Sequence, residues 1–469
     1  MTHSRTPHKD KSDCYFIPAG EAFSPACFVM PFFSCANFAG LFSLQLLTFV
    51  CRTPRTLSGG GIIRALTPSS NGLEKRPKLR FPGFDEPWRA AQLGNLLIEL
   101  SDYATQESGF PLLTSSRQGL FVQEDYFIDK QANAETTVFS VLPYGCITYR
   151  HMSDDNIFHF NINRLVANGL VSKEYPVFTV RKEVLDTDFL VDTLNSSPLF
   201  SVFCIQQKKG GTRTRLYFKT LCSYQMFLPV LHEQQVIASF IRLLDKRIER
   251  QMELVETLKK YKRGVMQRIF RQLPSQDGAE WACVRLGDIF KKVSRRNADG
   301  VIKNVITNSA EYGLIPQRDF FDKDIAVDGN TANYYVIENG DFVYNPRKSN
   351  SAPYGPFNRY TLSEQGIISP LYTCLVLQAD ISPSYLAWYF KSDAWYRYIY
   401  DNGSQGVRHD RVSMTDDLLM GIPVMYPSHE KQLLYADILD VVETRLQATQ
   451  KTLDLLSKTR DGYMRQLFI

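Results

Sequence analysis

Two basic stretches of this sequence contain side chains suited to binding nucleic acid. They cover residues 208–215 and 403–411, and both contain glycine. Arginine can bind a phosphate or pair with the edge of guanine through two donors, and glycine lets a backbone approach a duplex closely. Ordinary solvated turns have the same composition, so that alternative stays open. The side chains predicted to contact DNA here are Lys208, Lys209, Arg213, Arg215, Gln405, Arg408 and Arg411.

A second group of candidate DNA contacts lies within or just after predicted strands. Hydroxyl groups can hydrogen-bond to phosphates and base edges, and arginine and lysine neutralise phosphate charge. Polar residues after a strand often belong to a plain loop, which is the alternative here. The group consists of Thr114, Ser116, Arg150, Thr307, Ser309, Arg347 and Lys348.

Motifs of common enzyme classes are absent from the sequence. It has no GxxxxGK phosphate loop and no HExxH zinc motif. An Asn-Pro-Pro-aromatic motif, in which amino-methyltransferases resemble one another, is also missing, because Asn345 and Pro346 are followed by Arg347. We therefore expect no catalytic residues and no metal on this chain. A nuclease carboxylate cluster stays an alternative, since its spacing is diffuse.

Histidine and cysteine spacings give no sign of a metal site. His232-Glu233 and His429-Glu430 have no second histidine four residues from the first, and we interpret the glutamates as first-turn acids at the positive end of a helix. The nine cysteines form no CxxC pair. Neither a zinc site nor a disulfide framework is predicted, and the expected location is a reducing cytoplasm.

The composition is that of a globular protein with room for two or three domains. Of 469 residues, 44% are hydrophobic and 22% charged, and the net charge of +5 permits contact with DNA without establishing it. Residues 28–51 carry no charge and are long enough to span a bilayer, but Pro31 and Gly40 interrupt them. We expect residues 1–76 to be a poorly ordered extension, with a membrane anchor as the alternative.

The sequence repeats itself once, at a spacing of 193 to 198 residues. Trp88 and Gly94 return as Trp281 and Gly287. Four further segments return in the same order: 113–120 as 306–314, 143–149 as 338–344, 169–175 as 366–372, and 229–233 as 423–430. Matches that keep this order indicate an internal duplication.

Each half of the repeat ends in a stretch whose apolar residues recur every 3.5 residues, which is typical of a coiled coil. Both stretches are polar at the same two places, Gln251 with Thr449 and Lys262 with Arg460, and this favours a single register. The predicted coiled-coil contacts are Ile237, Ile241, Leu244, Ile248, Val255 and Leu258 in the first helix and Leu439, Val442, Leu446, Leu453 and Leu456 in the second.

The direction of the second helix follows from a short linker. Ten residues separate Phe270 from Trp281, so the second globular part must begin close to the end of the first helix. The second helix then runs back, which predicts an antiparallel pair. From Ile237 to Ile269 the first helix covers about 50 Å at ~1.5 Å per residue, and it would hold the two globular parts apart, related by an approximate two-fold axis.

The globular parts contain short strand-like runs between Gly, Pro and Asn residues, with short helices predicted at 186–194 and 383–391. The predicted fold class is α+β, with two similar globular domains separated by a long antiparallel coiled coil. The predicted boundaries are 77–228 for the first domain, 229–271 for the first long helix, 272–278 for a linker, 279–426 for the second domain and 427–469 for the second long helix.

Several segments resemble the specificity (S) subunits of type I restriction-modification systems. They are residues 77–84 (PKLRFPGF), Trp88 before Leu93 and Gly94, Pro229 before 232–235 (HEQQ), and the helix ends 262–270 and 462–468. The resemblance covers residues 77–469 and is most specific in the helices, because the recognition domains of this family vary.

The resemblance implies that each globular part is a target-recognition domain that reads half of a bipartite site on double-stranded DNA. It also implies that the helices dock methyltransferase (M) subunits, with two the expected number, and that restriction (R) subunits join them. S-adenosylmethionine would then belong to the M subunits, and ATP and magnesium to the R subunits, so no cofactor is expected on this chain. The main alternative is a coiled-coil scaffold that binds proteins without reading DNA, and a stand-alone DNA enzyme is the weaker one.

Overall fold

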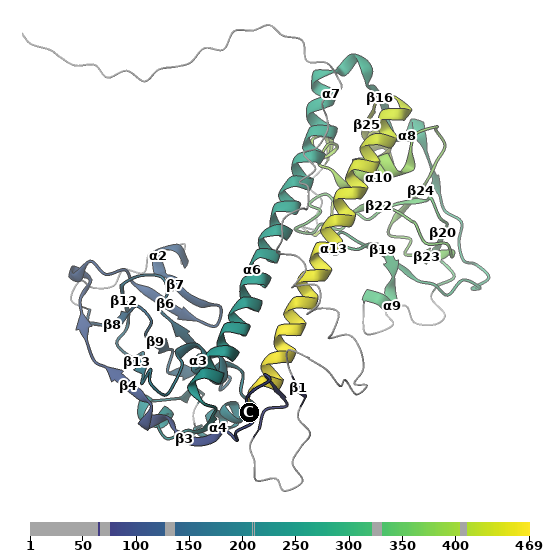
Figure 1. Cartoon of the computed structure of the whole chain (residues 1–469). Coiled ribbons are helices and arrows are strands. Elements are labelled where there is room, and N and C mark those ends of the chain that lie inside the picture. Colours follow the sequence, from purple (N-terminus) through teal and green to yellow (C-terminus); the bar gives the residue numbers. More distant parts are fainter. Residues whose placement is uncertain are drawn as a thin grey trace, which may run out of the picture. The chain divides into compact units, whose positions relative to one another are not determined.

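The computed structural model describes residues 64–65, 76–126, 137–208, 210, 212–320, 331–403 and 410–469 (Figure 1). These residues form helices and antiparallel strands, which agrees with the predicted α+β class. None of the described helices is both long and apolar enough to cross a membrane. Nearly all of the predicted extension at 1–76 lies outside the described residues, as do Lys209, Gln405 and Arg408.

The first domain is built around an antiparallel four-stranded sheet in the order β11-β9-β13-β4. A three-stranded sheet, β12-β8-β5, and a hairpin, β6–β7, accompany it, and β3 pairs with β15. The strands of this domain are β3 (Arg89–Gln92), β4 (Leu97–Leu100), β5 (Tyr103–Ala104), β6 (Leu113–Ser116), β7 (Gly119–Val122), β8 (Phe139–Pro143), β9 (Ile147–Tyr149), β10 (Met152–Ser153), β11 (Phe160–Ile162), β12 (Asn168–Ser172), β13 (Val177–Val180), β14 (Thr214–Arg215) and β15 (Gln225–Leu228). Its helices are α2 (Gln123–Tyr126), α3 (Thr187–Ser196), α4 (Pro198–Gln206) and α5 (Phe218–Leu221), and β1 (Arg64–Ala65) pairs with β2 (Leu79–Arg80) ahead of it.

The second domain has the same strand plan. Its four-stranded sheet has the order β22-β21-β24-β17, its second sheet pairs β20 with β23, its hairpin is β18–β19, and β16 pairs with β25. The strands are β16 (Ala282–Arg285), β17 (Phe290–Val293), β18 (Ile306–Ser309), β19 (Gly313–Pro316), β20 (Tyr335–Ile337), β21 (Phe342–Tyr344), β22 (Phe357–Arg359), β23 (Gly366–Ile368), β24 (Thr373–Leu377) and β25 (Pro423–Tyr426). The helices are α8 (Leu286–Ile289), α9 (Gln317–Phe320), α10 (Pro383–Lys391), α11 (Tyr396–Asn402) and α12 (Asp416–Met420).

One close contact between strands is repeated in the two domains. A Cβ atom on Gly169 would lie 2.2 Å from Leu113, and a Cβ atom on Gly366 would lie 2.4 Å from Ile306. Glycine is therefore favoured at both positions, because any other residue would force the side chain of the neighbouring hairpin strand to move. This contact gives a physical reason for the glycines that recur in the sequence.

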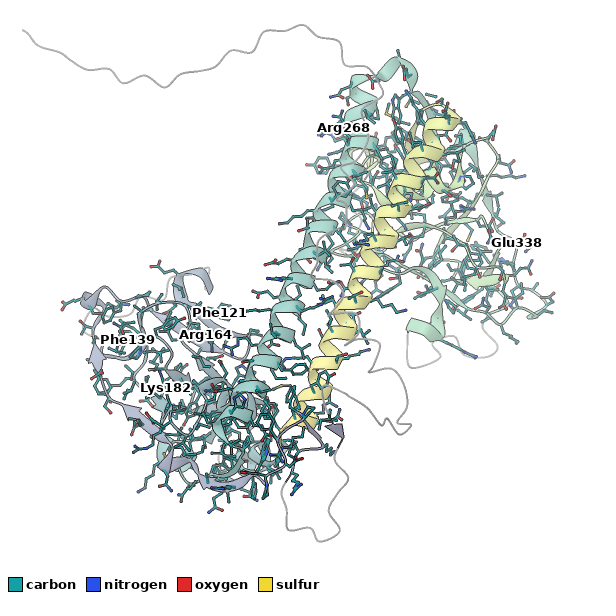
Figure 2. The ribbon with its side chains drawn as sticks, viewed as in Figure 1. Phe121, Phe139, Arg164, Lys182, Arg268 and Glu338 are labelled. Carbon is teal, nitrogen blue, oxygen red and sulfur yellow. The ribbon has the colours of Figure 1, made fainter. Side chains whose placement is uncertain are left out.

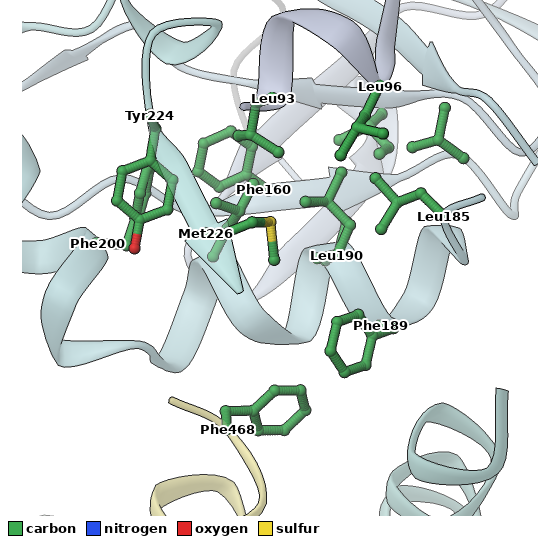
Figure 3. Close-up of a cluster of buried hydrophobic side chains, with 14 of the residues drawn as sticks. Leu93, Leu96, Phe160, Leu185, Phe189, Leu190, Phe200, Tyr224, Met226 and Phe468 are labelled. Carbon is green, nitrogen blue, oxygen red and sulfur yellow. The ribbon is translucent and has the colours of Figure 1, made fainter. Parts of the chain in front are cut away.

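The core of the first domain draws side chains from both long helices, α6 (Leu231–Gln267) and α13 (His429–Leu467). Ile237 and Ile241 enter it from the first turns of α6, and Met464 and Leu467 from the last turns of α13. Figure 3 shows Phe468, just beyond α13, facing Phe189 of α3, and the two ring centroids are 5.4 Å apart. Burial of these apolar groups attaches the start of one helix and the end of the other to the same domain.

The core of the second domain uses the opposite ends of the two helices. Ile269 and Phe270 enter it from a π-helical turn (Arg268–Gln272) that extends α6, and Ala436 and Leu439 enter it from the first turns of α13. A short helix, α7 (Leu273–Gln276), then leads into the domain. Figure 2 shows Arg268 at this end of α6 and Glu338 within the second domain.

Between the domains the two long helices pack against each other in opposite directions. Gln251 Nε2 donates to the Thr449 carbonyl at 2.9 Å, close to the middle of both helices. Val255 and Leu456 are buried. Asp245 in the first half of α6 pairs with Arg460 near the end of α13, which requires an antiparallel arrangement.

Two basic residues of the helix seam have partners that the sequence analysis did not identify. Lys262 pairs with Glu443 at 2.8 Å, and Arg460 pairs with Asp245 at 2.7 Å. Arg460 lies 198 residues after Lys262, and Glu443 lies 198 residues after Asp245. The two salt bridges are therefore equivalent under the repeat, with the two helices exchanged. These residues are therefore not simply polar interruptions, because each cation meets an acid of the other helix, which disfavours shifted registers.

The start of each long helix shows that the predicted match of 229–233 with 423–430 was wrong in register. Gln234 donates to the Pro229 carbonyl at 3.0 Å, and Gln432 donates to the Pro427 carbonyl at 2.9 Å. Pro229 therefore corresponds to Pro427, which sets the offset here at 198 residues. His232-Glu233 and His429-Glu430 are 197 residues apart, one residue out of this register, so the two pairs are not structurally equivalent.

The interpretation of Glu233 as a simple first-turn acid was also incomplete. Arg80 donates to both of its carboxylate oxygens, at 2.7 and 2.8 Å, and the Glu233 side chain is fully buried. The pair ties β2 to the first turn of α6. Glu430 is exposed by contrast, so its location fits the first-turn interpretation.

Candidate nucleic-acid interface

The first strand of each hairpin turns its predicted DNA contacts to the same side. In β6, Thr114 and Ser116 are half-buried, and the residues before each of them are buried. In β18, Thr307 and Ser309 show the same alternation. Since successive side chains of a strand point to opposite faces, the hydroxyl groups lie on one outward face in both domains.

A buried amide holds each hairpin in place. Asn161 Nδ2 of β11 donates to Ser115 Oγ at 2.8 Å, and Asn358 Nδ2 of β22 donates to Asn308 Oδ1 at 2.7 Å. Leaving a buried amide without a partner costs about 1 to 3 kcal/mol, so these bonds favour one position of the hairpin on the sheet. The hydroxyls beside them are thereby positioned by equivalent contacts in the two domains.

The two serines of this set already have partners within their own turns. Ser116 Oγ donates to the Gly119 carbonyl at 3.1 Å, and Ser309 Oγ accepts from the backbone of Glu311 and Tyr312 at 3.2 Å. These bonds shape the hairpin turns. The presence of serine at these positions is therefore explained in part by the local turn structure. The sequence alone could not distinguish this structural role from a role in binding.

The structure brings the end of each basic stretch beside the loop that follows a central strand. In the first domain β10 pairs with β14, which places Met152 opposite Arg215, two residues beyond Arg150. In the second domain Arg347 lies opposite Arg411 in an isolated antiparallel bridge. Candidates that are far apart in the sequence thus meet at equivalent places in the two domains.

A tyrosine that the sequence analysis did not select lies at each of these places. Burial raises the pKa of Tyr175, and the nearby charge of Arg150 opposes this rise. Burial also raises the pKa of Tyr372, against a hydrogen bond with Thr307 and the charge of Arg347. Both tyrosines follow a repeated glycine by six residues, and that recurrence was the available signal.

In the first domain the candidates line a cavity of about 470 Å³. Thr114, Ser116, Arg150 and Tyr175 contribute to its wall, together with an aromatic side chain, Phe158. Figure 2 labels Phe121 on β7, the second strand of the hairpin that borders this cavity. A concave surface that combines hydroxyl, guanidinium and aromatic groups is suited to phosphates and base edges.

Two ion pairs, which the sequence did not predict, involve residues that line this cavity, Arg117 and Asp154. Arg117 of the hairpin turn pairs with Asp155 at 2.5 Å, and Arg213 pairs with Asp154 at 2.7 Å. Hydrogen bonds from Arg117 and Ser153 hold the pKa of Asp155 at about 2, so this carboxylate stays charged at neutral pH. The predicted contact Arg213 is therefore shared with an acid.

Not every predicted contact reaches this surface. Lys208 lies beyond the end of α4, is exposed, and is not among the residues that line the cavity. In the part of the chain that the structure describes, no three His, Cys, Asp or Glu residues are grouped to hold a metal ion.

Comparisons with known proteins match one segment of the chain to a protein family and its fold to solved structures. Residues 168–260, which run from β12 into α6, match the type I restriction modification DNA specificity domain. The fold is similar to that of the type I restriction-modification S subunit from M. genitalium, at 15% identity and a TM-score of 0.50 over 84% of this chain and 99% of that one. The HsdS subunit from Thermoanaerobacter tengcongensis also matches, at 16% identity and a TM-score of 0.44 over 85% and 99% of the chains. No curated protein sequence matches the chain.

Proposed function

We propose that this chain, which contains a type I restriction modification DNA specificity domain at residues 168–260, is the DNA-recognition subunit of a type I restriction-modification complex. Each domain would bind one half of a bipartite site on double-stranded DNA. The observation that carries this proposal is that one arrangement of hydroxyl, arginine and tyrosine side chains occurs in both domains, around Tyr175 and Tyr372.

The attachment of the domains to the helices supports a site in two parts. Ile241 contributes to the core of the first domain and Ile269 to that of the second. These residues lie 28 positions apart on one continuous helix, about 42 Å at ~1.5 Å per residue. At ~3.4 Å per base pair this corresponds to about 12 base pairs, a little over one turn of B-DNA, so unread bases would separate the half-sites.

In this proposal the chain binds DNA and does no chemistry itself. Its partners would be M subunits, two in number, docked on the long helices, and R subunits that join them. S-adenosylmethionine would be bound by the M subunits, and ATP and magnesium by the R subunits. The competing function is a helical scaffold that binds proteins without reading DNA.

Salt-dependent DNA binding separates these two functions. The purified chain with its M subunit is expected to shift a random duplex at low salt, with affinity that falls steeply as salt rises, because phosphate contacts release counterions. Arg150→Ala should weaken binding and lower the salt slope by about 1, and Lys182→Ala, which removes an exposed cation from the loop after β13, should leave both unchanged. A complex that retains no DNA at low salt would support the scaffold.

A further inference from the structure

The loops that follow β9 and β21 occupy equivalent places in the two domains. Met152 lies opposite Arg215, and Arg347 lies opposite Arg411, so the two strand pairings align residues 152–155 with residues 347–350. The alignment is fixed by backbone pairing and by the sheet order, so it does not depend on similarity between the two loop sequences.

The aligned loops carry opposite charge. Residues 152–155 are Met, Ser, Asp and Asp, with a net charge of −2, and residues 347–350 are Arg, Lys, Ser and Asn, with a net charge of +2. The hairpin turns differ in the opposite sense, because Arg117 of the first domain corresponds to Ala310 of the second. The hairpin turn of the first domain therefore has a cation where that of the second has none, and of the two aligned segments only 152–155 contains carboxylates.

The two carboxylates of the first domain have different surroundings. Asp155 Oδ1 receives hydrogen bonds from Arg117, Ser153 and the backbone of Ile157, so it holds the loop in shape. Asp154 is 67% exposed, and its Oδ1 accepts from Arg213. Within the described residues no hydrogen bond reaches Asp154 Oδ2, which leaves that atom available to a ligand.

A carboxylate at a DNA surface restricts what can bind beside it. It repels phosphate and can only accept hydrogen bonds, and in the major groove the exocyclic amino group of cytosine is the donor that carboxylates typically bind. Arginine or lysine in the aligned loop attracts phosphate instead. The charge difference thus assigns different tasks to the same loop in the two domains.

We propose that Asp154 is a specificity-determining residue that accepts a hydrogen bond from a cytosine amino group in the half-site bound by the first domain, whereas Arg347 and Lys348 bind phosphate at the other half-site. Asp155 and Arg117 are positioning residues for this contact. The inference rests on the proposed function and names the chemistry of its first half-site.

The test compares the DNA motifs that are methylated in a host expressing the M subunit with either the wild-type chain or a variant. Asp154→Asn should relax or change one base pair in one half of the motif and leave the other half intact, because an amide both donates and accepts. It should also raise the affinity for random duplex DNA several-fold at low salt. Glu99→Gln makes the same charge change at an exposed position of β4, the edge of the four-stranded sheet opposite β11, and should alter neither readout.

A second variant tests the other loop. Arg347→Ala with Lys348→Ala should lower the slope of log affinity against log salt by about 2 while the methylated motif keeps its sequence. An unchanged motif in Asp154→Asn, or a changed motif in the Arg347 and Lys348 variant, overturns the inference. Failure of the proposed function has a different signature, since the wild-type chain would then direct no bipartite motif at all.

Discussion

At the residue scale, Asp192 on α3 has an environment that strongly disfavours its charge. Burial raises its pKa to about 7, and the acids Asp245, Asp188 and Asp186 add to this rise while Arg460 opposes it. The folded-state pKa lies above the unfolded value of about 3.9, so the protonated group stabilises the fold below about pH 4. That contribution is lost as the pH rises towards 7.

Replacing this acid with its amide should remove the pH-dependent loss. Asp192→Asn is expected to raise the free energy of unfolding at pH 8 by on the order of 1 to 3 kcal/mol and to change it much less at about pH 4, where the wild-type group begins to be protonated in the unfolded state as well as the folded one. Urea denaturation at the two pH values measures this difference. Asp437→Asn, on the exposed surface of α13, is the control. An equal gain at both pH values would show that burial of charge is not the cause.

The residues that the sequence analysis missed are those whose partners lie far away in the chain. Arg80 and Glu233 are 153 residues apart, and no local pattern indicates that they pair. Asp154 and Asp155 resembled ordinary loop acids until the fold placed Arg213 and Arg117 beside them. Arg150 and Thr114 were selected because residue type and position after a strand are visible in the sequence, and the structure brings them to one cavity.

At the element scale, the contact between each hairpin and the neighbouring strand gives a direct test of packing. Gly169→Ala should destabilise the protein by about 1 to 3 kcal/mol, since the new methyl group would meet Leu113 at 2.2 Å. Gly366→Ala should behave similarly against Ile306. Thermal unfolding measures both changes.

A third glycine supplies the matched control. Gly264 lies within α6, and a Cβ atom there would meet nothing within 4 Å. Gly264→Ala should therefore stabilise the chain by about 0.5 to 1 kcal/mol, as expected for a helix interior. If Gly169→Ala were as well tolerated as Gly264→Ala, the close approach of β12 to β6 would be wrong.

Elements with a long or strong periodic pattern were the ones that the sequence could predict. The helix expected at 229–271 begins at Leu231 and continues through a π-helical turn to Gln272, and α3 and α10 lie where short helices were predicted at 186–194 and 383–391. Strands β10 and β14 have two residues each, so they carry no alternation to detect. Their pairing depends on the tertiary fold, and it contributes to the alignment of the two loops that we propose to contact DNA.

At the scale of the whole molecule, the two long helices connect the domains. The salt bridges Lys262–Glu443 and Arg460–Asp245 lie at equivalent positions of the 198-residue repeat on opposite helices. An approximate two-fold axis between the two halves requires this equivalence. The repeat and the linker length predict this relation, because both are explicit in the sequence. The bases that each domain reads could not be predicted, because they depend on side-chain geometry in loops.

The most direct test of the central claim is the methylation pattern of a host genome that expresses this chain with its methyltransferase partner. If two similar domains on opposed helices each read half of a site, the modified motif will have two short specified parts separated by a fixed run of unspecified bases. A single uninterrupted motif, or no new modification with both proteins present, would contradict the account.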